Sequence, residues 1–168
     1  MWELYTFWAF VPTILLIFIK NNPSTSLNIP LLSFLIIGLG GLSCIAGGYI
    51  SENKGTKKTA TLALLFSGMS CLIAPLILNS HSSLLLIVFL IFWGLMVIAD
   101  SPLFSTLVAQ NADPTIKGTA LTIVNCIGFS ITIISLQCIN WAFPFLGNYT
   151  FMLLAIGPIL GLLALKTD

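Results

Sequence analysis

The stretch Gly48-Tyr-Ile-Ser-Glu52-Asn53-Lys54-Gly55-Thr56-Lys57-Lys58 decides the fold, because it is a dense patch of charge between two long apolar runs. It holds three of the six basic residues of the chain. A polar turn between two apolar segments marks the place where a chain leaves the lipid bilayer, and short cytoplasmic loops accumulate lysine and arginine. Gly55 permits a tight turn with positive φ, so the flanking segments are predicted to return antiparallel.

The composition of the whole chain agrees with this interpretation. Hydrophobic residues make up 58% of the 168 residues and the mean hydropathy is +1.08, whereas soluble domains are about 45–50% apolar. A water-soluble domain of this size could not bury so much apolar surface, so lipid is expected to solvate most of it. The net charge is +1 and arginine is absent, which argues against a nucleic-acid-binding surface.

Outward from the turn, the sequence divides into apolar runs near the roughly 20 residues that a helix needs to cross a bilayer. Each run is expected to be helical, because an isolated strand in lipid leaves its backbone groups unpaired. The predicted fold class is therefore an all-α integral membrane protein, with six transmembrane helices within residues 1–168 and no separate soluble domain. The six expected spans are Tyr5–Ile19, Ile29–Ile50, Thr59–Leu78, Leu84–Val108, Thr119–Ile139 and Tyr149–Leu165.

The lysines predict the orientation of these spans. With six spans, both termini and the loops Ser51–Lys58 and Asn111–Lys117 share one side of the membrane. That side collects five lysines, against Lys20 alone on the other, so both termini are predicted to be cytoplasmic. The first span is short and follows Glu3 directly, so either it begins in the membrane interface or its first turns are missing.

The charged turn also resembles a known signature. The pattern Gly48-x-x-x-Glu52-Asn53-x-Gly55-Thr56-Lys57-Lys58 is similar to the G-x-x-x-D-R-x-G-R-R/K motif of the major facilitator superfamily. That motif lies in the cytoplasmic loop between the second and third helices and, more weakly, between the eighth and ninth. Both glycines and the final basic pair are kept, whereas Glu52, Asn53 and Thr56 depart from it, as is typical of the C-terminal copy. Residues 1–12, 99–110 and 117–122 resemble the seventh helix, the tenth helix and the start of the eleventh of bacterial permeases.

The resemblance implies the C-terminal half, helices seven to twelve, of a secondary transporter in the bacterial cytoplasmic (inner) membrane. This half would contain two three-helix inverted repeats and a truncated first helix. Its expected partners are the lipid bilayer, a small-molecule substrate, and either an N-terminal six-helix half or a second copy of the chain. The alternative is a non-transporting membrane subunit or an inert fragment of a split or truncated permease.

The same resemblance suggests roles for individual residues. Glu52, Lys57 and Lys58 would hold one conformational state shut through contacts with the other half, and the alternative is an ordinary positively charged turn. By family position, Glu3, Tyr5 and Trp8 would line a cavity, although Trp8 fits an interfacial aromatic belt equally well.

Asp100 is the strongest candidate from the residues themselves. An ionisable group deep in a span costs at least ~2.5 kcal/mol, so it is rarely found without a partner or a cavity. Trp93, Met96 and Phe104 share its helical face. We expect either proton coupling or substrate contact, from a helix broken near Pro102, or an aspartate at a helix end exposed to the cytoplasmic headgroups.

Polar and small residues complete the set of candidates. The stripe Gly118, Thr122, Asn125, Phe129 and Thr132 is expected to face other helices or water, with Asn125 binding substrate or linking helices. The small-residue ridges Gly40-x-x-x-Cys44-x-x-x-Gly48 and Gly157-x-x-x-Gly161 are expected to pack closely. The four cysteines show no metal or disulfide spacing, and no cofactor is expected. With Asp100 as the single candidate catalytic group, the sequence does not predict an enzyme.

Overall fold

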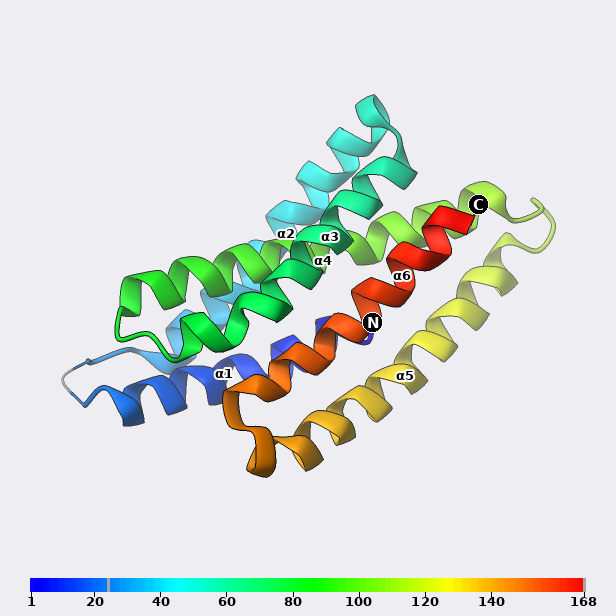
Figure 1. Cartoon of the computed structure of the whole chain (residues 1–168). Helices are drawn as coiled ribbons and strands as arrows, with labels where there is room; N and C mark the ends of the chain where they lie inside the picture. Colours follow the sequence, from blue (N-terminus) through cyan, green and yellow to red (C-terminus); the bar gives the residue numbers. More distant parts are fainter. Residues whose placement is uncertain (24, 168) are drawn as a thin grey trace.

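The computed structural model describes residues 1–23 and 25–167, and all regular secondary structure in these ranges is helical (Figure 1). Five stretches are long and apolar enough to cross a membrane, namely the first four α-helices and the continuous stretch Lys117–Lys166. The predicted all-helical architecture is therefore confirmed. The elements are α1 (Leu4–Asn21), α2 (Ile29–Lys54), α3 (Thr56–Leu78), α4 (Ser83–Asn111), α5 (Lys117–Leu146), the 3-10 helix η1 (Gly147–Ala155) and α6 (Ile156–Thr167).

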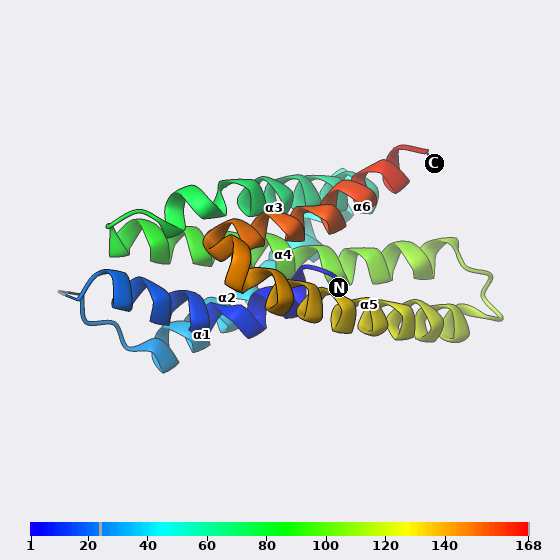
Figure 2. The same cartoon turned by 60° about the horizontal axis from the view of Figure 1, so that its bottom comes forward.

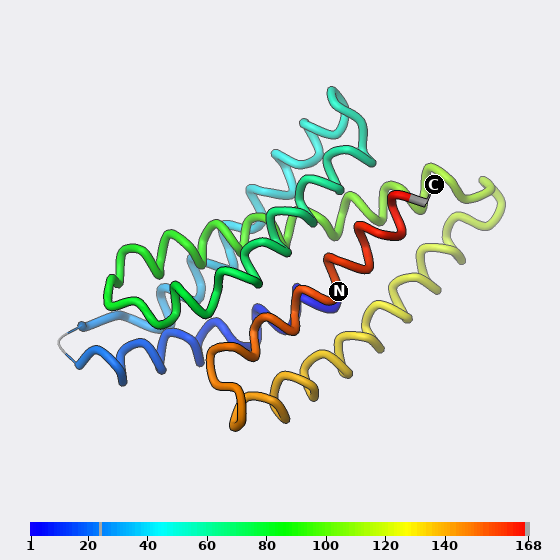
Figure 3. Tube along the Cα trace, in the orientation of Figure 1, coloured from blue at the N-terminus to red at the C-terminus, as the bar shows by residue number. Residues whose placement is uncertain are grey.

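The last apolar run differs from the single α-helix that was predicted over Tyr149–Leu165. The chain reverses after α5 at Gly147, which has a φ of +52°, and continues as η1 before α6 begins (Figure 3). Pro158 lies in the first turn of α6, where proline is tolerated because the N–H it lacks has no helical partner. Proline alone does not explain the 3-10 segment, because α1, α3, α4 and α5 each continue through an internal proline.

The turn between α2 and α3 has the predicted geometry. Gly55 has a φ of +90°, which confirms that glycine supplies a backbone conformation unfavourable for other residues. Its N–H donates to the carbonyl of Ser51 at 2.9 Å and closes α2, while its carbonyl accepts from the N–H of Thr59 at 3.2 Å and opens α3. One glycine thus ends one helix and begins the next.

Helix α4 is the centre of the bundle, since it contacts α1, α2, α3 and α5. In Figure 2, α3 and α6 lie together on one side of α4, with α1 and α5 on the other. The core is built around Trp93 of α4. Its ring lies 4.8 Å from that of Phe7, 5.6 Å from Phe89 and 6.4 Å from Phe151, measured between centroids. Aromatic packing thereby joins α1, α4 and η1.

Close helix contact occurs at small residues, but the register of one ridge differs from the prediction. On α2, Gly40 and Gly47 are buried against α4, whereas Gly48 is exposed and a methyl group there would touch nothing within 4 Å. With 3.6 residues per turn, a step of seven residues returns to within about 20° of the same direction, whereas a step of eight overshoots it by about 80°. On the other ridge, a methyl group added at Gly157 would lie 2.9 Å from Cδ1 of Trp2, which confirms close packing there.

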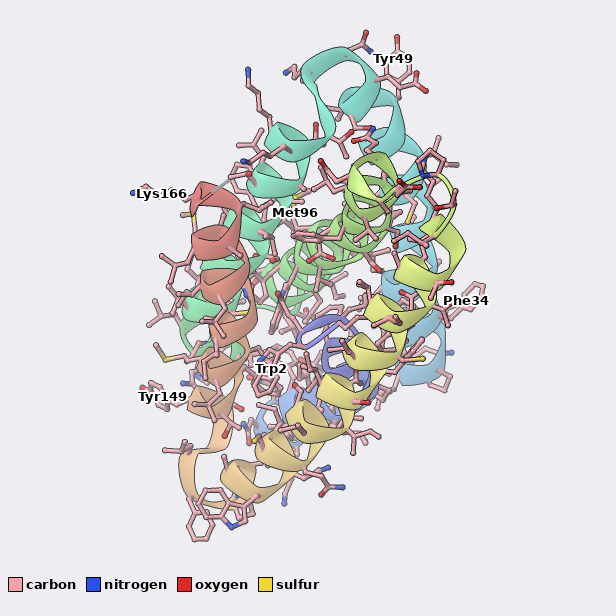
Figure 4. All side chains as sticks on the ribbon, turned by 90° about the vertical axis from the view of Figure 1, so that its right-hand side faces the viewer. Trp2, Phe34, Tyr49, Met96, Tyr149 and Lys166 are labelled. Carbon is pink, nitrogen blue, oxygen red and sulfur yellow. The ribbon has the colours of Figure 1, made fainter. Side chains whose placement is uncertain are left out.

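The outer faces of the bundle carry large apolar side chains. Phe34 on α2, Tyr49 near the α2–α3 turn and Tyr149 on η1 point away from the bundle, whereas Trp2 points into it (Figure 4). Such a continuous apolar exterior is far larger than soluble proteins expose. It suits the hydrocarbon of a bilayer.

Side chains join the connections at one end of the bundle. Nδ1 of His81, which precedes α4, is hydrogen-bonded to Oδ1 of Asn22 at 2.8 Å. The amide of Asn148 in η1 donates to Oδ1 of Asn79 at 2.8 Å. The connections α1–α2, α3–α4 and α5–η1 therefore lie at the same end, opposite the α2–α3 turn (Figure 1).

Candidate functional site

Glu3 lies in the interior of the bundle, although the sequence places it beside the start of an apolar run. Its backbone carbonyl accepts from the N–H of Phe7 at 2.8 Å, so α1 begins immediately after it. The side chain is only 4% exposed. Nε1 of Trp93 donates to Oε1 at 2.6 Å, and Sγ of Cys71 donates to the same oxygen at 3.2 Å. Glu3 thereby links α1 to α3 and α4.

Hydroxyl groups on α5 hold the start of α1 in this position. Oγ1 of Thr6 donates to Oγ of Ser135 at 2.8 Å, and Ser135 in turn donates to the carbonyl of Trp2 at 2.7 Å. The hydroxyl of Thr132 lies 3.1 Å from the carbonyl oxygen of Gly128 in its own helix and 3.3 Å from that of Met1. In Figures 1 and 2 the N-terminal end of α1 accordingly lies beside α6 and α5, about midway along the bundle.

Asp100 is buried in an unbroken helix. Its side chain is 7% exposed, and α4 continues for more than two further turns to Asn111. The alternative of an exposed helix-end aspartate is therefore wrong, and so is the predicted break near Pro102. Proline at this position leaves the carbonyl of Ile98 without its helical donor. Sγ of Cys44, from α2, lies 3.9 Å from that carbonyl oxygen and donates to it, as neighbouring helices do in membranes.

Glu3 and Asp100 line the same cavity of about 320 Å³, between the start of α1 and helices α4, α5 and α6. Phe104 and Asn125, both predicted to face a cavity or other helices, line it as well. The cavity thus brings together two acids that lie 97 residues apart in the sequence.

Each acid in the cavity has a fully buried oxygen without a hydrogen-bond partner in the described ranges. Oε2 of Glu3 and Oδ1 of Asp100 are buried and have no hydrogen-bond partner within residues 1–23 and 25–167. A buried polar group without a partner costs free energy, and a buried charge costs more. These oxygens are therefore places where a proton or a cationic donor would be stabilised. No group of three or more metal-ligating side chains occurs in the described ranges.

Other predicted residues occupy supporting positions. Trp93 is fully buried and does not line the cavity; it positions Glu3. Tyr5 and Trp8 are in edge-to-face contact at 5.3 Å, and Tyr5 also lies 5.4 Å from the ring of Phe129 on α5. Neither lines this cavity, so their aromatic rings serve the contact between α1 and α5.

The charged turn forms a separate surface at the end of the bundle. Lys54, Lys57 and Lys58 line a groove of about 920 Å³ between the α2–α3 turn and the end of α4. Nε2 of Gln110 donates to Oγ1 of Thr56 at 3.4 Å across this groove. Glu52 and Gly48 are exposed on the last turns of α2 and lie outside its lining. No side chain within the described ranges forms an ion pair with Glu52.

The sequence gives little sign of several residues that build the cavity. Cys71 lies in an apolar run like many others, and its contact with Glu3 depends on how α3 packs. Ser101 and Gly128 line the cavity from α4 and α5. Ser101 could have been predicted as a lining residue, since it adjoins Asp100 in the sequence. Nothing in the sequence around Gly128 indicates that it lines a cavity.

Comparison with known proteins gives one match. The family model described as Major Facilitator Superfamily matches residues 2–136. No curated protein and no solved structure matches the chain. The matched range covers α1 to α4 and part of α5, and it includes Glu3, Asp100, Asn125 and the charged turn.

Proposed function

Because this chain belongs to the major facilitator superfamily, we propose that it takes part in moving a small solute across a membrane by secondary transport. Members of the superfamily are transporters rather than enzymes, and the apolar helices suit an integral membrane protein. The specific proposal is that Glu3 and Asp100 contact the solute or carry a coupled proton. Asn125 would contribute a hydrogen bond from α5.

One observation carries the proposal. Two buried acids, on helices far apart in the sequence, line one cavity and each keeps an oxygen without a partner. An ionisable group within a membrane-spanning bundle is costly and usually marks a path for a substrate or a proton. A structural role would instead leave both carboxyl groups fully hydrogen-bonded.

We further propose six crossings with both termini in the cytoplasm. The stretch Lys117–Lys166 contains 50 residues, far more than the roughly 20 that one crossing needs, and it reverses at Gly147 (Figure 3). Two crossings in this stretch and one in each of α1 to α4 make six. The lysines of the α2–α3 turn and Lys117 lie in connections at one end, which supports a cytoplasmic location for that end.

The eroded signature at Glu52, Asn53 and Thr56 favours the C-terminal half of a bacterial inner-membrane permease, built from two three-helix inverted repeats. The partner in transport would then be an N-terminal six-helix half or a second copy of the chain. In that assembly, Glu52, Lys57 and Lys58 would contact the other half in one conformational state. Their exposure leaves them free for such a contact.

Transport by the purified chain in liposomes tests the proposal. A proton gradient is imposed, and the internal pH is followed with a trapped fluorescent dye while labelled amines, sugars and carboxylic acids are added one at a time. We expect uptake of one class and a change in its pH dependence in Asp100→Asn. Native mass measurement of the same sample shows whether one or two copies are present.

The competing function is that of a non-transporting membrane subunit or an inert fragment. That function predicts no uptake of any solute class, and identical liposome leakage for the unmodified chain and for Asp100→Asn. Uptake that remains undiminished and equally pH-dependent in Asp100→Asn would instead keep transport and remove the coupling role of the aspartate.

A further inference from the structure

The cavity between α1, α4, α5 and α6 is lined by two acidic residues, and these restrict the class of solute that can bind there. Oε2 of Glu3 and Oδ1 of Asp100 are hydrogen-bond acceptors without donors in the described ranges, and both side chains are more than nine-tenths buried. From two such acceptors on residues that line one cavity, we propose that the cavity binds an organic ammonium ion with an apolar body. This inference rests on the proposed transport function, because it names the substrate class of the same site.

The charges that face the cavity favour a cation. Its lining contains the carboxyl groups of Glu3 and Asp100 and no lysine or histidine. Two ionised carboxylates in this lining have no cationic side chain beside them among the described residues. An anionic solute would meet repulsion, and a neutral one would leave the acceptors without a charged donor.

The hydrogen-bonding pattern favours an ammonium group in particular. Oε1 of Glu3 already accepts from Trp93 and Cys71, and the hydroxyl of the neighbouring Ser67 donates to the carbonyl of Leu64 at 3.2 Å, so Oε2 remains to be satisfied. A primary ammonium carries three N–H donors, so it has a donor for each of the two free oxygens. Charge-assisted hydrogen bonds of this kind are shorter and about twice as strong as neutral ones.

The walls of the cavity favour an organic ion over an inorganic one. A calcium ion takes about 6–8 oxygen ligands gathered around one point, whereas no group of three or more His, Cys, Asp or Glu side chains able to hold a metal ion occurs in the described ranges. The oxygen-bearing side chains of the lining are Glu3, Asp100, Ser101, Ser105 and Asn125. The hydroxyl of Ser105 already donates to the carbonyl of Ser101 at 3.2 Å. The remaining lining is largely apolar and includes Trp2 and Phe104, whose rings can contact an apolar body or a cation.

The size of the cavity agrees with this assignment. Its volume of about 320 Å³ is near the lower limit of about 300 Å³ for small-molecule pockets and many times the roughly 30 Å³ that a water molecule occupies. A single aromatic ring with a short ammonium side chain fits this range. A large polycyclic cation would exceed it.

Equilibrium binding of three compounds that share a phenylethyl group tests the inference without requiring transport. The purified chain is placed in nanodiscs of neutral phosphatidylcholine, and binding of tritiated 2-phenylethylamine is measured by equilibrium dialysis against empty nanodiscs. Competition by 2-phenylethanol and by 3-phenylpropanoate compares a neutral and an anionic analogue with the same ring. We expect the amine to bind about 10- to 100-fold more tightly than the alcohol, because hydrogen bonds to a charged group contribute more binding free energy than neutral ones. We expect the acid to bind more weakly than the alcohol.

A matched pair of variants localises the binding. Asp100→Asn removes an acid from the cavity, and we expect it to weaken amine binding at least about tenfold while leaving the affinity for the alcohol unchanged. Asp113→Asn is the control. Asp113 is exposed in the α4–α5 connection, where its Oδ1 accepts from N and Oγ1 of Thr115 at 2.9 and 2.6 Å, and we expect it to bind the amine like the unmodified chain.

The outcomes separate this inference from the proposed function. Equal affinities for the amine and the alcohol, or an unchanged amine affinity in Asp100→Asn, would overturn the ammonium assignment. Sodium ions and ammonium ions are also compared as competitors of the bound amine. If sodium displaces the amine as effectively as ammonium does, the site binds an inorganic cation and the assignment is overturned. If the amine assignment fails while the liposomes still take up a sugar or an acid, transport stands. If the amine binds but nothing is transported, the site stands and the transport function fails.

Discussion

Replacing Gly40 with alanine tests whether the contact between α2 and α4 holds the bundle together. Helix α2 packs mainly against α4, and Gly40 lies on that face. A methyl group at Gly40 would overlap Cδ1 of Ile98 and would lie 3.0 Å from its Cγ1 and 3.1 Å from its Cβ. Rotation of the side chain can move Cδ1 and Cγ1 away, but Cβ, at 3.1 Å, is fixed by the backbone of α4. The two helices must therefore separate by a few tenths of an ångström.

The magnitude follows from two opposing terms. Overpacking of a close contact costs about 1–3 kcal/mol, whereas alanine is favoured over glycine inside a helix by about 0.8–1.0 kcal/mol. Gly41 provides a matched control, since it is the next residue of the same helix and a methyl group there touches nothing within 4 Å. The helix-propensity term is common to Gly40→Ala and Gly41→Ala. The difference between the two variants therefore isolates the packing cost, and we expect Gly40→Ala to be less stable than Gly41→Ala by about 1–3 kcal/mol.

The free energy of unfolding is measured in dodecyl maltoside micelles by titration with sodium dodecyl sulfate, with helix content followed by circular dichroism. We expect Gly41→Ala to be as stable as the unmodified chain or slightly more stable. Variants that differ by less than about 0.5 kcal/mol, the range of surface substitutions, would refute the close approach of α2 to α4 at this position.

Three further predictions concern other parts of the chain. Trp93→Phe removes the indole N–H that donates to Glu3. We expect the same titration to show a free energy of unfolding lower by at least about 1–3 kcal/mol, because a buried acceptor loses a partner. Gly55→Ala places a side chain at a φ of +90°, and we expect backbone strain to lower the free energy of unfolding by about 1–3 kcal/mol. Gly48→Ala is the control, since Gly48 lies in regular helix with open space around it, and we expect no loss of stability there. For the orientation, Lys58→Cys should react with a membrane-impermeant maleimide only from the cytoplasmic side and His81→Cys only from the opposite side. Labelling of both from one side would contradict six crossings.

The sequence predicts the helices well, because the physics that determines them is local. The apolar composition predicts that lipid surrounds the chain. In lipid, a segment must satisfy its own backbone hydrogen bonds, and a helix does so. The turn at Gly55 was predictable for the same reason, since glycine between two apolar runs in a polar stretch has few alternatives. The 3-10 segment before Pro158 was less visible, because proline is compatible both with the first turn of a helix and with a kink.

Helix register was predictable only to within one residue. The ridge through Gly40 and Cys44 was correctly placed on α2, but the next contact on that face is Gly47 rather than Gly48. Both are glycines, so composition does not distinguish them. Only the angle at which α2 crosses α4 decides which of the two is buried.

Asp100 was singled out because an acid within an apolar run is costly, but the sequence left its burial open. An unbroken helix through Pro102 requires a donor for the carbonyl of Ile98, and that donor, Cys44, is 54 residues away in the sequence. A cysteine in an apolar run is normally a small hydrophobic residue. Without the packing of α2 on α4, a helix end near Pro102 was the simpler expectation.

The pairing of Glu3 with Asp100 depends on a similar long-range arrangement, and it explains why an acid is tolerated at the start of α1. Trp93 binds Glu3 across 90 residues of sequence, and it lies two helical turns before Asp100 on the same face of α4. An indole that holds one acid therefore also fixes that acid's distance from the second. If the cavity binds a cation between the two acids, Trp93→Phe should weaken binding of the amine as well as stability, whereas Gly40→Ala, which acts on the opposite face of α4, should lower stability and leave the amine affinity unchanged. Equal losses of affinity in the two variants would show that binding merely reports the stability of the bundle.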